Sequence, residues 1–209
     1  MFLKGALCEL RALEGNDQEA AIFTRAVNAG LTTRHLLTGS IPMRQIDIQA
    51  IWKKEREAGS VEFAIWSTHQ EKEFNFDERC DEPKHFGIHH THVMMESKFI
   101  GTCGLYSHRD IYRSWEFRIL IFDPSAIGHG IGEEATRLTV GYCFNRLNAH
   151  RVWLGCNEAN IGAIKCYEKV GFIKEGVLRE DLFCFGKYYN AVRYGILENE
   201  WKSASPAKA

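Results

Sequence analysis

The chain has 209 residues, of which 45% are hydrophobic and 25% are charged. This composition is typical of one globular domain and excludes a disordered or fibrous chain. The 26 basic and 27 acidic residues give a net charge of −1, which argues against a protein that coats DNA through its phosphates, so no nucleic-acid partner is expected. An anionic small molecule remains allowed, because backbone amides can hold an anion without basic side chains.

The seven cysteines predict reduced thiols rather than disulfides. Their number is odd, none forms a C-x-x-C pair, and most lie in apolar contexts, as in cytosolic proteins. The first residues carry charge inside any candidate signal core, and no apolar run approaches the ~18 residues of a membrane span. We therefore expect a soluble, cytoplasmic protein with no membrane partner.

The apolar patterning predicts a β-α-α-β-β-β-α-β-α-β-β order, which is a mixed α/β or α+β sheet domain. Strands are expected at 8–13, 61–66, 91–95 with 99–106, 115–122, 151–156, 178–185 and 189–197. One helix follows Asn16 or Asp17, a second follows Pro42 and closes before Gly59, and two more span 130–147 and 160–170. Residues 67–95 are polar and rich in histidine, and they predict an insertion or a long hairpin. Residues 203–209 predict a disordered tail, which leaves one domain over 1–202.

Alternating glycines follow the strongest predicted strand, at 115–122. Gly128, Gly130 and Gly132 lead directly into a helix. The first turn of a helix has free N–H groups and a partial positive charge, and glycine lets a phosphate approach the backbone closely. The segment therefore predicts an anion cradle suited to a pyrophosphate.

Two known phosphate loops do not match this segment. A P-loop needs Lys-Ser/Thr after its last glycine, whereas Glu133 and Glu134 stand here. A dinucleotide fingerprint needs G-x-G-x-x-G in an N-terminal βαβ unit, whereas this spacing is G-x-G-x-G. Taken alone, the glycines also fit an ordinary turn between a strand and a helix.

A second motif narrows the interpretation. From Asn160 to Phe172 the sequence reads N-x-x-A-x-x-x-Y-x-K-x-G-F. The two motifs together resemble the GNAT superfamily of acyl-CoA-dependent N-acetyltransferases, because the glycine segment is similar to that family's V-x-P-x-x-R/Q-x-x-G-x-G/A motif. Residues 175–201 further resemble the branch of ribosomal-protein N-terminal acetyltransferases and spermidine acetyltransferases. The resemblance is strong over 99–201, weaker over 10–66 and absent from 67–95.

The resemblance implies an α+β fold whose central, mostly antiparallel twisted sheet splays at the coenzyme site and is flanked by helices. It implies that the chain transfers acetyl from acetyl-CoA to a primary amine by direct attack in a ternary complex. The acceptor stays open between a protein N-terminus, a polyamine and an amino sugar. A non-catalytic CoA-binding sensor or scaffold is the alternative, and a homodimer is compatible with the sequence.

The resemblance also assigns roles to single residues. Asn160 would bond the pantetheine arm of CoA, and Tyr167 would protonate the departing thiolate, because a phenol stays protonated at pH 7. The splayed strand end around Leu120 to Phe122 would pair with the pantetheine amides. The pyrophosphate would be held by the backbone amides of Ile127, Gly128, His129, Gly130, Ile131 and Gly132.

Three positions depart from the family pattern. Ile127 stands where the family has its first Arg or Gln, and Phe122 replaces the usual valine. Because backbone groups carry most of the contact, binding of CoA is expected to survive the change at Ile127. Phe122 is bulkier than valine and would lie beside the thioester, so it affects the shape expected for the acyl pocket. His129 stands at a commonly basic position and could add charge near a phosphate.

The attacking amine must lose a proton, so a base is required. Glu116 stands where many family members carry a base-like Glu, and it is also compatible with a structural or substrate-binding carboxylate. Strand alternation puts Glu116, Arg118 and Leu120 on one face.

Histidines 85, 89, 90 and 92 match no zinc spacing, so we expect no metal. The candidates for lining the acceptor site, or for an ordinary polar loop, are Tyr106, His108, Arg109, Asp110 and Tyr112.

Overall fold

A computed structural model describes residues 2–29, 42–68, 97–184 and 186–204. Its eight strands form one sheet in the order β1-β2-β3-β4-β5-β6-β8-β7. Every neighbouring pair is antiparallel except β5 with β6. The strands are β1 (Phe2–Lys4), β2 (Cys8–Ala12), β3 (Val61–Ser67), β4 (Phe99–Arg109), β5 (Ser114–Ile121), β6 (Arg151–Asn157), β7 (Ile173–Cys184) and β8 (Lys187–Leu197).

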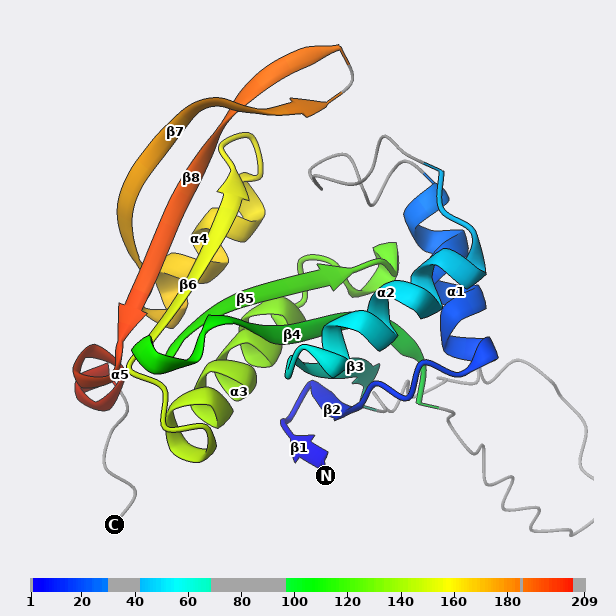
Figure 1. Cartoon of the computed structure of the whole chain (residues 1–209), viewed down its shortest axis with the longest axis horizontal. Helices are drawn as coiled ribbons and strands as arrows, with labels where there is room; N and C mark the ends of the chain where they lie inside the picture. Colours follow the sequence, from blue (N-terminus) through cyan, green and yellow to red (C-terminus); the bar gives the residue numbers. More distant parts are fainter. Residues whose placement is uncertain (1, 30–41, 69–96, 185, 205–209) are drawn as a thin grey trace, which may run out of the picture.

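Helices cover both faces of the sheet (Figure 1). On one face, α1 (Asp17–Asn28) and α2 (Gln45–Glu57) enclose a small core that includes Ala20, Trp52 and Phe122. On the other, α3 (Ile131–Arg146) and α4 (Ile161–Val170) enclose the main core. A last helix, α5 (Glu198–Ala204), follows β8. The sheet is thus a packed middle layer, as the sequence predicts for an α+β fold.

The sheet opens between β5 and β6. These strands pair only from Ser114 with Arg151 to Glu116 with Trp153, although β5 continues to Ile121 and β6 to Asn157. Figure 1 shows them side by side at one end and diverging toward the other. Beyond Glu116, β6 keeps its pairing with β8, and β5 keeps its pairing with β4. The predicted splay is confirmed, and it leaves the β6-facing edge of β5 without a strand partner.

Most predicted elements are present, with differences at the C-terminal end. Strand β7 begins at Ile173, five residues before the predicted start. Its first half contains Lys174, Glu175 and Gly176, which do not favour strands, and it pairs with β8 through register shifts at the edge of the sheet. Helix α5 extends to Ala204 because Trp201 stacks on Phe144 at 6.0 Å between ring centroids. The predicted disordered tail is therefore wrong for residues 203 and 204.

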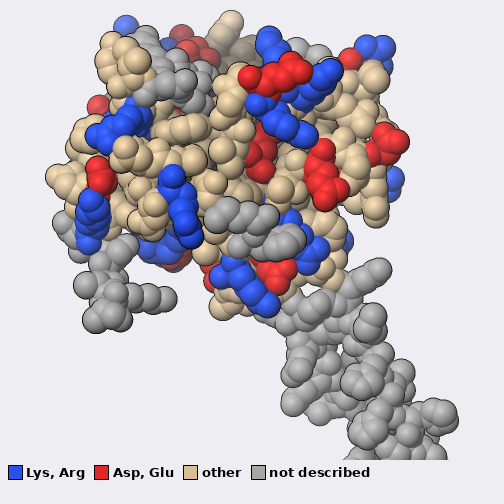
Figure 2. Space-filling model, turned by 60° about the horizontal axis from the view of Figure 1, so that its bottom comes forward, with Lys and Arg blue, Asp and Glu red and all other residues tan. Residues whose placement is uncertain are grey.

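Other predictions fall where the structure gives no description. The expected strand at 91–95, nearly all of the predicted insertion at 67–95, and residues 205–209 lie outside the described residues. Within the described helices, none is long and apolar enough to span a bilayer. Figure 2 shows basic and acidic side chains interspersed over one face of the molecule, consistent with the nearly balanced charge.

A single carboxylate ties the N-terminal turn to α3. Glu134, in the first turn of α3, accepts hydrogen bonds from the N–H groups of Ala6, Leu7 and Cys8, each at 2.8 Å. A carboxylate that accepts several N–H bonds is well stabilised, and here it joins segments more than 120 residues apart in sequence. The contact therefore holds the start of α3 against the β1–β2 turn.

We expect Glu134→Ala to lower the free energy of unfolding by about 2 kcal/mol, because three N–H groups lose a charged acceptor. For a chain of this size, that is roughly 4–8 °C in Tm, measurable by thermal denaturation. Glu133→Ala is the matched control, since its ion pairs are surface contacts expected to change stability by less than about 0.5 kcal/mol. Equal losses in the two variants would contradict the assigned role of Glu134.

Candidate functional site

The loop between β5 and α3 starts with a braced aspartate. Asp123 caps the short 3-10 helix Pro124–Ala126, because its Oδ1 accepts from the N–H of Ser125 at 3.0 Å and from its hydroxyl at 2.7 Å. Lys98 Nζ lies 2.5 Å from Asp123 Oδ2. Burial opposes the charge on Asp123, but Lys98 and Ser125 outweigh it and lower the pKa of the carboxyl. The entrance to the loop is therefore fixed.

The glycines then turn the loop so that its amides are free. Gly128 and Gly130 have φ angles of 85° and 82°, in the left-handed region that glycine adopts without strain, and Gly130 is the N-cap of α3. The first helical bond is donated by the N–H of Glu134 to Gly130 at 3.0 Å. Before it, the N–H groups of residues 128–133 donate to no other described residue. Six consecutive free amides at a helix start form an anion-binding nest.

The run of free amides begins one residue later than the predicted run of 127–132. The N–H of Ile127 donates to Pro124 at 3.3 Å, so that amide is occupied, while the side chain of Ile127 is exposed. The side chain of His129 is exposed as well. The negative charge of Glu133 lies close to the loop, but two cations offset it: Arg137 lies 3.2 Å and Lys169 4.0 Å from its carboxylate.

The backbone groups along the open edge of β5 alternate in direction. The N–H of Phe122 donates to Ile100 on β4 at 3.0 Å, so it is directed away from the opening. Because strand groups alternate, the outward N–H and C=O groups belong to Ile119 and Ile121 rather than to Leu120 and Phe122. The ring of Phe122 is buried against Phe23, 6.1 Å between centroids, on the α1 face. Within the predicted stretch from Leu120 to Phe122, Ile121 is therefore the residue whose backbone faces the opening, and its pairing with pantetheine stays a prediction.

Asn160 has a structural role in the described residues. It is the N-cap of α4, and its Oδ1 accepts from the N–H of Ala163 at 3.2 Å. Its carbonyl oxygen is therefore engaged, while its Nδ2 has no hydrogen-bond acceptor among the described residues. Contact of Asn160 with a pantetheine arm stays a prediction, and only the amide nitrogen could donate it.

Tyr167 lies on α4 and packs against β8, in the part of the sheet that diverges from β5. Its side chain is 8% exposed, and its ring contacts Phe172 at 6.0 Å and Tyr194 of β8 at 6.4 Å between centroids. Burial, with smaller contributions from Cys156 and Cys166, raises the pKa of its hydroxyl. Its hydroxyl forms no hydrogen bond with another described residue. The phenol is therefore a protonated donor on a largely buried side chain.

The raised pKa changes the role expected of Tyr167. A phenol with a pKa above its usual value of ~10 gives up its proton to a thiolate of pKa ~8.5 only uphill. It can still donate a strong hydrogen bond to the sulfur as negative charge develops there. Either role of Tyr167 toward the departing sulfur stays a prediction, and the raised pKa favours the hydrogen bond.

Glu116 stands at the point where the sheet opens. It is the last residue of β5 paired with β6, and its side chain is 17% exposed. Its Oε2 accepts from Nη2 of Arg118 at 2.9 Å. Leu120 on the same face packs in the core under α1 and α2, whereas Phe117 packs in the core under α3 and α4. The predicted alternation of faces is confirmed.

Comparison with known proteins identifies the family. The family model described as "Acetyltransferase (GNAT) domain" matches residues 10–173. The chain belongs to the GNAT acetyltransferase family. The spermidine N(1)-acetyltransferase of Escherichia coli K12 is 32% identical over 120 residues, which are 54% of this chain and 64% of that protein. The match thus spans somewhat less than two thirds of that relative.

Solved structures share the GNAT fold. The spermidine N-acetyltransferase of Vibrio cholerae, in complex with CoA and spermine, has a TM-score of 0.73 at 22% identity, covering 95% of this chain and 99% of that one. The ribosomal L7/L12 alpha-N-protein acetyltransferase RimL, in complex with coenzyme A, has a TM-score of 0.71 at 13% identity, covering 94% and 98%. The predicted fold class and the predicted branch of the family are confirmed.

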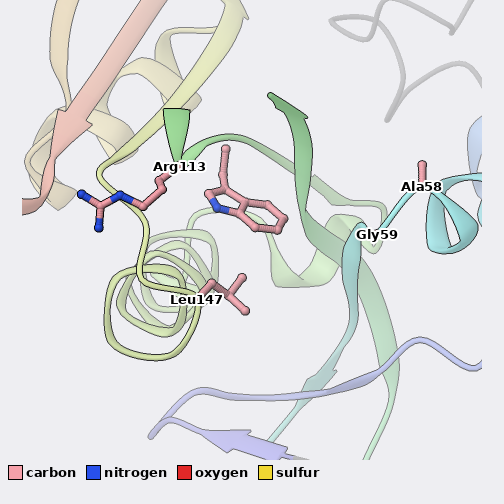
Figure 3. Close-up of a pocket in the computed structure, with 5 residues that line it drawn as sticks. Ala58, Gly59, Arg113 and Leu147 are labelled. Carbon is pink, nitrogen blue, oxygen red and sulfur yellow. The ribbon is translucent and has the colours of Figure 1, made fainter. Parts of the chain in front are cut away.

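A separate hollow lies away from the GNAT loop. It has a volume of about 350 Å³ and is lined by Ala58, Gly59, Arg113, Trp115 and Leu147 (Figure 3). Arg113 and Trp115 stand at the start of β5, whereas the glycine loop follows its end, about 25 Å along an eight-residue strand. The guanidinium of Arg113 donates to the side-chain oxygen of Asn148 at 3.0 Å. The hollow is therefore not part of the candidate site.

Metal ligation is not indicated in the described part of the chain, where no group of three His, Cys, Asp or Glu side chains is arranged around a common point. The histidines at 85, 89, 90 and 92 lie outside the described residues, and so do the side chains of 107–110. The expectation of no metal stays a prediction.

Glu62 is a second carboxylate near the candidate site, and it was not predicted from the sequence. Glu62 of β3 accepts from the hydroxyl of Tyr106 at 2.8 Å, on the same face as Glu116. Burial raises the pKa of Glu62, in spite of the opposing Tyr106 hydrogen bond. The signal was a single acidic residue inside the apolar strand Val61–Ser67, since a buried carboxylate needs a partner.

We expect Gly128→Ala to weaken CoA binding about tenfold or more, measured by isothermal titration calorimetry. A Cβ at φ 85° costs about 1–2 kcal/mol, so the loop relaxes and its amides turn away from the nest. Gly59→Ala is the matched control: Gly59 has φ 86° and, like Gly128, open space where a Cβ would lie, but it follows α2. Equal CoA affinity of Gly128→Ala and the unsubstituted chain would contradict the cradle.

Proposed function

We propose that this chain transfers an acetyl group from acetyl-CoA to a primary amine by direct attack in a ternary complex. The observation that carries the proposal is the run of six amides, 128–133, which donate to no other described residue and follow the open edge of β5 in the chain, together with the buried Tyr167 on α4. Family membership supports the same activity. The relative named spermidine N(1)-acetyltransferase and the neighbour holding CoA and spermine support an amine as acceptor.

In this proposal, different residues near the opening between β5 and β6 have different roles. The amides of 128–133 bind the pyrophosphate, and Ile119 and Ile121 offer outward backbone groups to the pantetheine amides. This arrangement directs the thioester toward Tyr167, whose hydroxyl donates a hydrogen bond to the sulfur as it leaves. Glu116 accepts the proton that the amine loses when it attacks. Acetyl-CoA supplies the activated acetyl group.

The acceptor carries positive charge in this proposal. Glu55, Glu62 and Glu116 lie on or over the α2 face of the sheet near the opening, and together they favour a cationic amine. We therefore propose a polyamine as the preferred acceptor, ahead of a protein N-terminus and an amino sugar. We further propose a cytoplasmic location, supported by the six described cysteines, all of which are free thiols. A homodimer, and the absence of nucleic-acid and membrane partners, stay predictions.

A direct assay tests the activity. Purified protein is mixed with acetyl-CoA and with each of three amines: spermidine, an N-terminal peptide and glucosamine. Free CoA thiol is then followed with a thiol reagent. We expect thiol release that depends on an amine, and fastest with spermidine. A non-catalytic CoA-binding module would bind CoA in calorimetry and release no thiol with any amine, and absence of CoA binding would overturn both hypotheses.

We expect Tyr167→Phe to lower kcat roughly 10²-fold while CoA affinity stays within about twofold, because the ring still packs and only the donor to the sulfur is lost. Turnover and calorimetry on the same preparation measure both quantities. Tyr142→Phe is the matched control, since the Tyr142 ring packs on Phe63 at 5.5 Å in the main core. Unchanged kcat in Tyr167→Phe would remove Tyr167 from the reaction.

A further inference from the structure

An arginine on β5 is held beside the proposed base. Arg118 and Glu116 are two residues apart on one strand, so their side chains leave the same face of the sheet. Nη2 of Arg118 donates to Oε2 of Glu116 at 2.9 Å, and Nη1 lies 3.7 Å from Oε1 of Glu55 on α2. The guanidinium therefore bridges α2 and the strand that carries Glu116.

The position of Arg118 is set by an aromatic ring rather than by its ion pairs alone. Its guanidinium carbon lies 4.1 Å from the ring centroid of Tyr106 on β4, a cation–π contact. The Tyr106 hydroxyl is in turn anchored by its hydrogen bond to Oε1 of Glu62. Because Arg118 is 46% exposed, an unsupported ion pair with Glu116 would be loose and worth little.

The backbone makes room for this stack. In the sheet register, Glu62 faces Gly104 and Gly104 faces Arg118, while Tyr106 faces Glu116. A Cβ at residue 104 would lie 3.1 Å from atoms of the Tyr106 ring. Glycine at this position therefore lets the ring lie over β4, between Glu62 and Arg118.

We infer that Arg118 is a positioning residue for the reaction. Stacked on Tyr106, which Glu62 anchors, it holds the Glu116 carboxylate in one orientation at the mouth of the opening and places a positive charge beside it. The inference rests on the proposed role of Glu116 as the base. It adds that the orientation of the base depends on a neighbouring cation.

The charged groups near Glu116 determine in which direction its pKa changes when Arg118 is removed. Among the described residues, Glu55 approaches from α2, Glu62 and Tyr106 from β3 and β4, and Arg118 from β5 itself. On the β6 side the register partner of Glu116 is Trp153, and the guanidinium of Arg193 lies 4.3 Å from the Trp153 ring. Arg118 places a positive charge in direct contact with the Glu116 carboxylate. Removing Arg118 must raise the pKa of Glu116.

The test compares pH profiles of kcat/KM for the unsubstituted chain, Arg118→Ala and Arg118→Lys with the best amine of the panel. We expect Arg118→Ala to move the acid limb to higher pH by about 0.5–1, a three- to tenfold loss of kcat/KM on the acid side. Arg118→Lys keeps the charge but not the planar fork, so its limb stays near that of the unsubstituted chain while kcat falls. CoA affinity stays unchanged in both.

Two further variants separate this inference from the proposed function. In a Glu116→Gln background, Arg118→Ala should leave the pH profile unchanged, because the group it acts on is gone. Independently of turnover, NMR of the ¹³C-labelled Glu116 carboxyl should show its titration moving to higher pH in Arg118→Ala. If Glu116→Gln retains full kcat, the base assignment itself fails. If Glu116→Gln loses activity but Arg118→Ala moves neither the limb nor the titration, the role of Arg118 is overturned.

Discussion

Backbone pairing between β5 and β6 stops after Glu116, and the candidate site is arranged around that interruption. A parallel pair that continued would satisfy the N–H and C=O groups of Ile119 and Ile121 within the sheet. Because β6 stays paired with β8 instead, an extended ligand can take the place of the missing strand. Tyr167 packs against Tyr194 of β8, whereas Glu116 lies on β5 at the last residue paired with β6.

In the proposed function, backbone groups rather than basic side chains bind the anionic end of that ligand. The N–H groups of 128–133, at the start of α3, donate to no other described residue, and the helix dipole adds a partial positive charge there. The two glutamates in this turn do not oppose the anion alone, since Glu133 pairs with Arg137 and Glu134 binds the N-terminal turn. A chain with a net charge of −1 can therefore bind a pyrophosphate.

Features that depend on residues close together in the chain could be predicted from the sequence. The helix after the three glycines, the helix predicted over 160–170 and the alternation through Glu116 and Arg118 are all present in the structure. The sequence could not predict which strand edge each backbone group faces, because the bond from Phe122 to Ile100 depends on register. It also missed the stack of Tyr106 and Arg118 over Gly104, which needs three strands in one register.

The central claim is that the loop amides and the open edge of β5 together hold acetyl-CoA. Residue-resolved hydrogen exchange with and without CoA tests it most directly, because it reports each N–H separately. The account predicts slower exchange at residues 128–133 and at Ile119 and Ile121, with little change around the hollow lined by Gly59 and Trp115. Saturating CoA that leaves those amides unprotected, or protects the hollow instead, would contradict it.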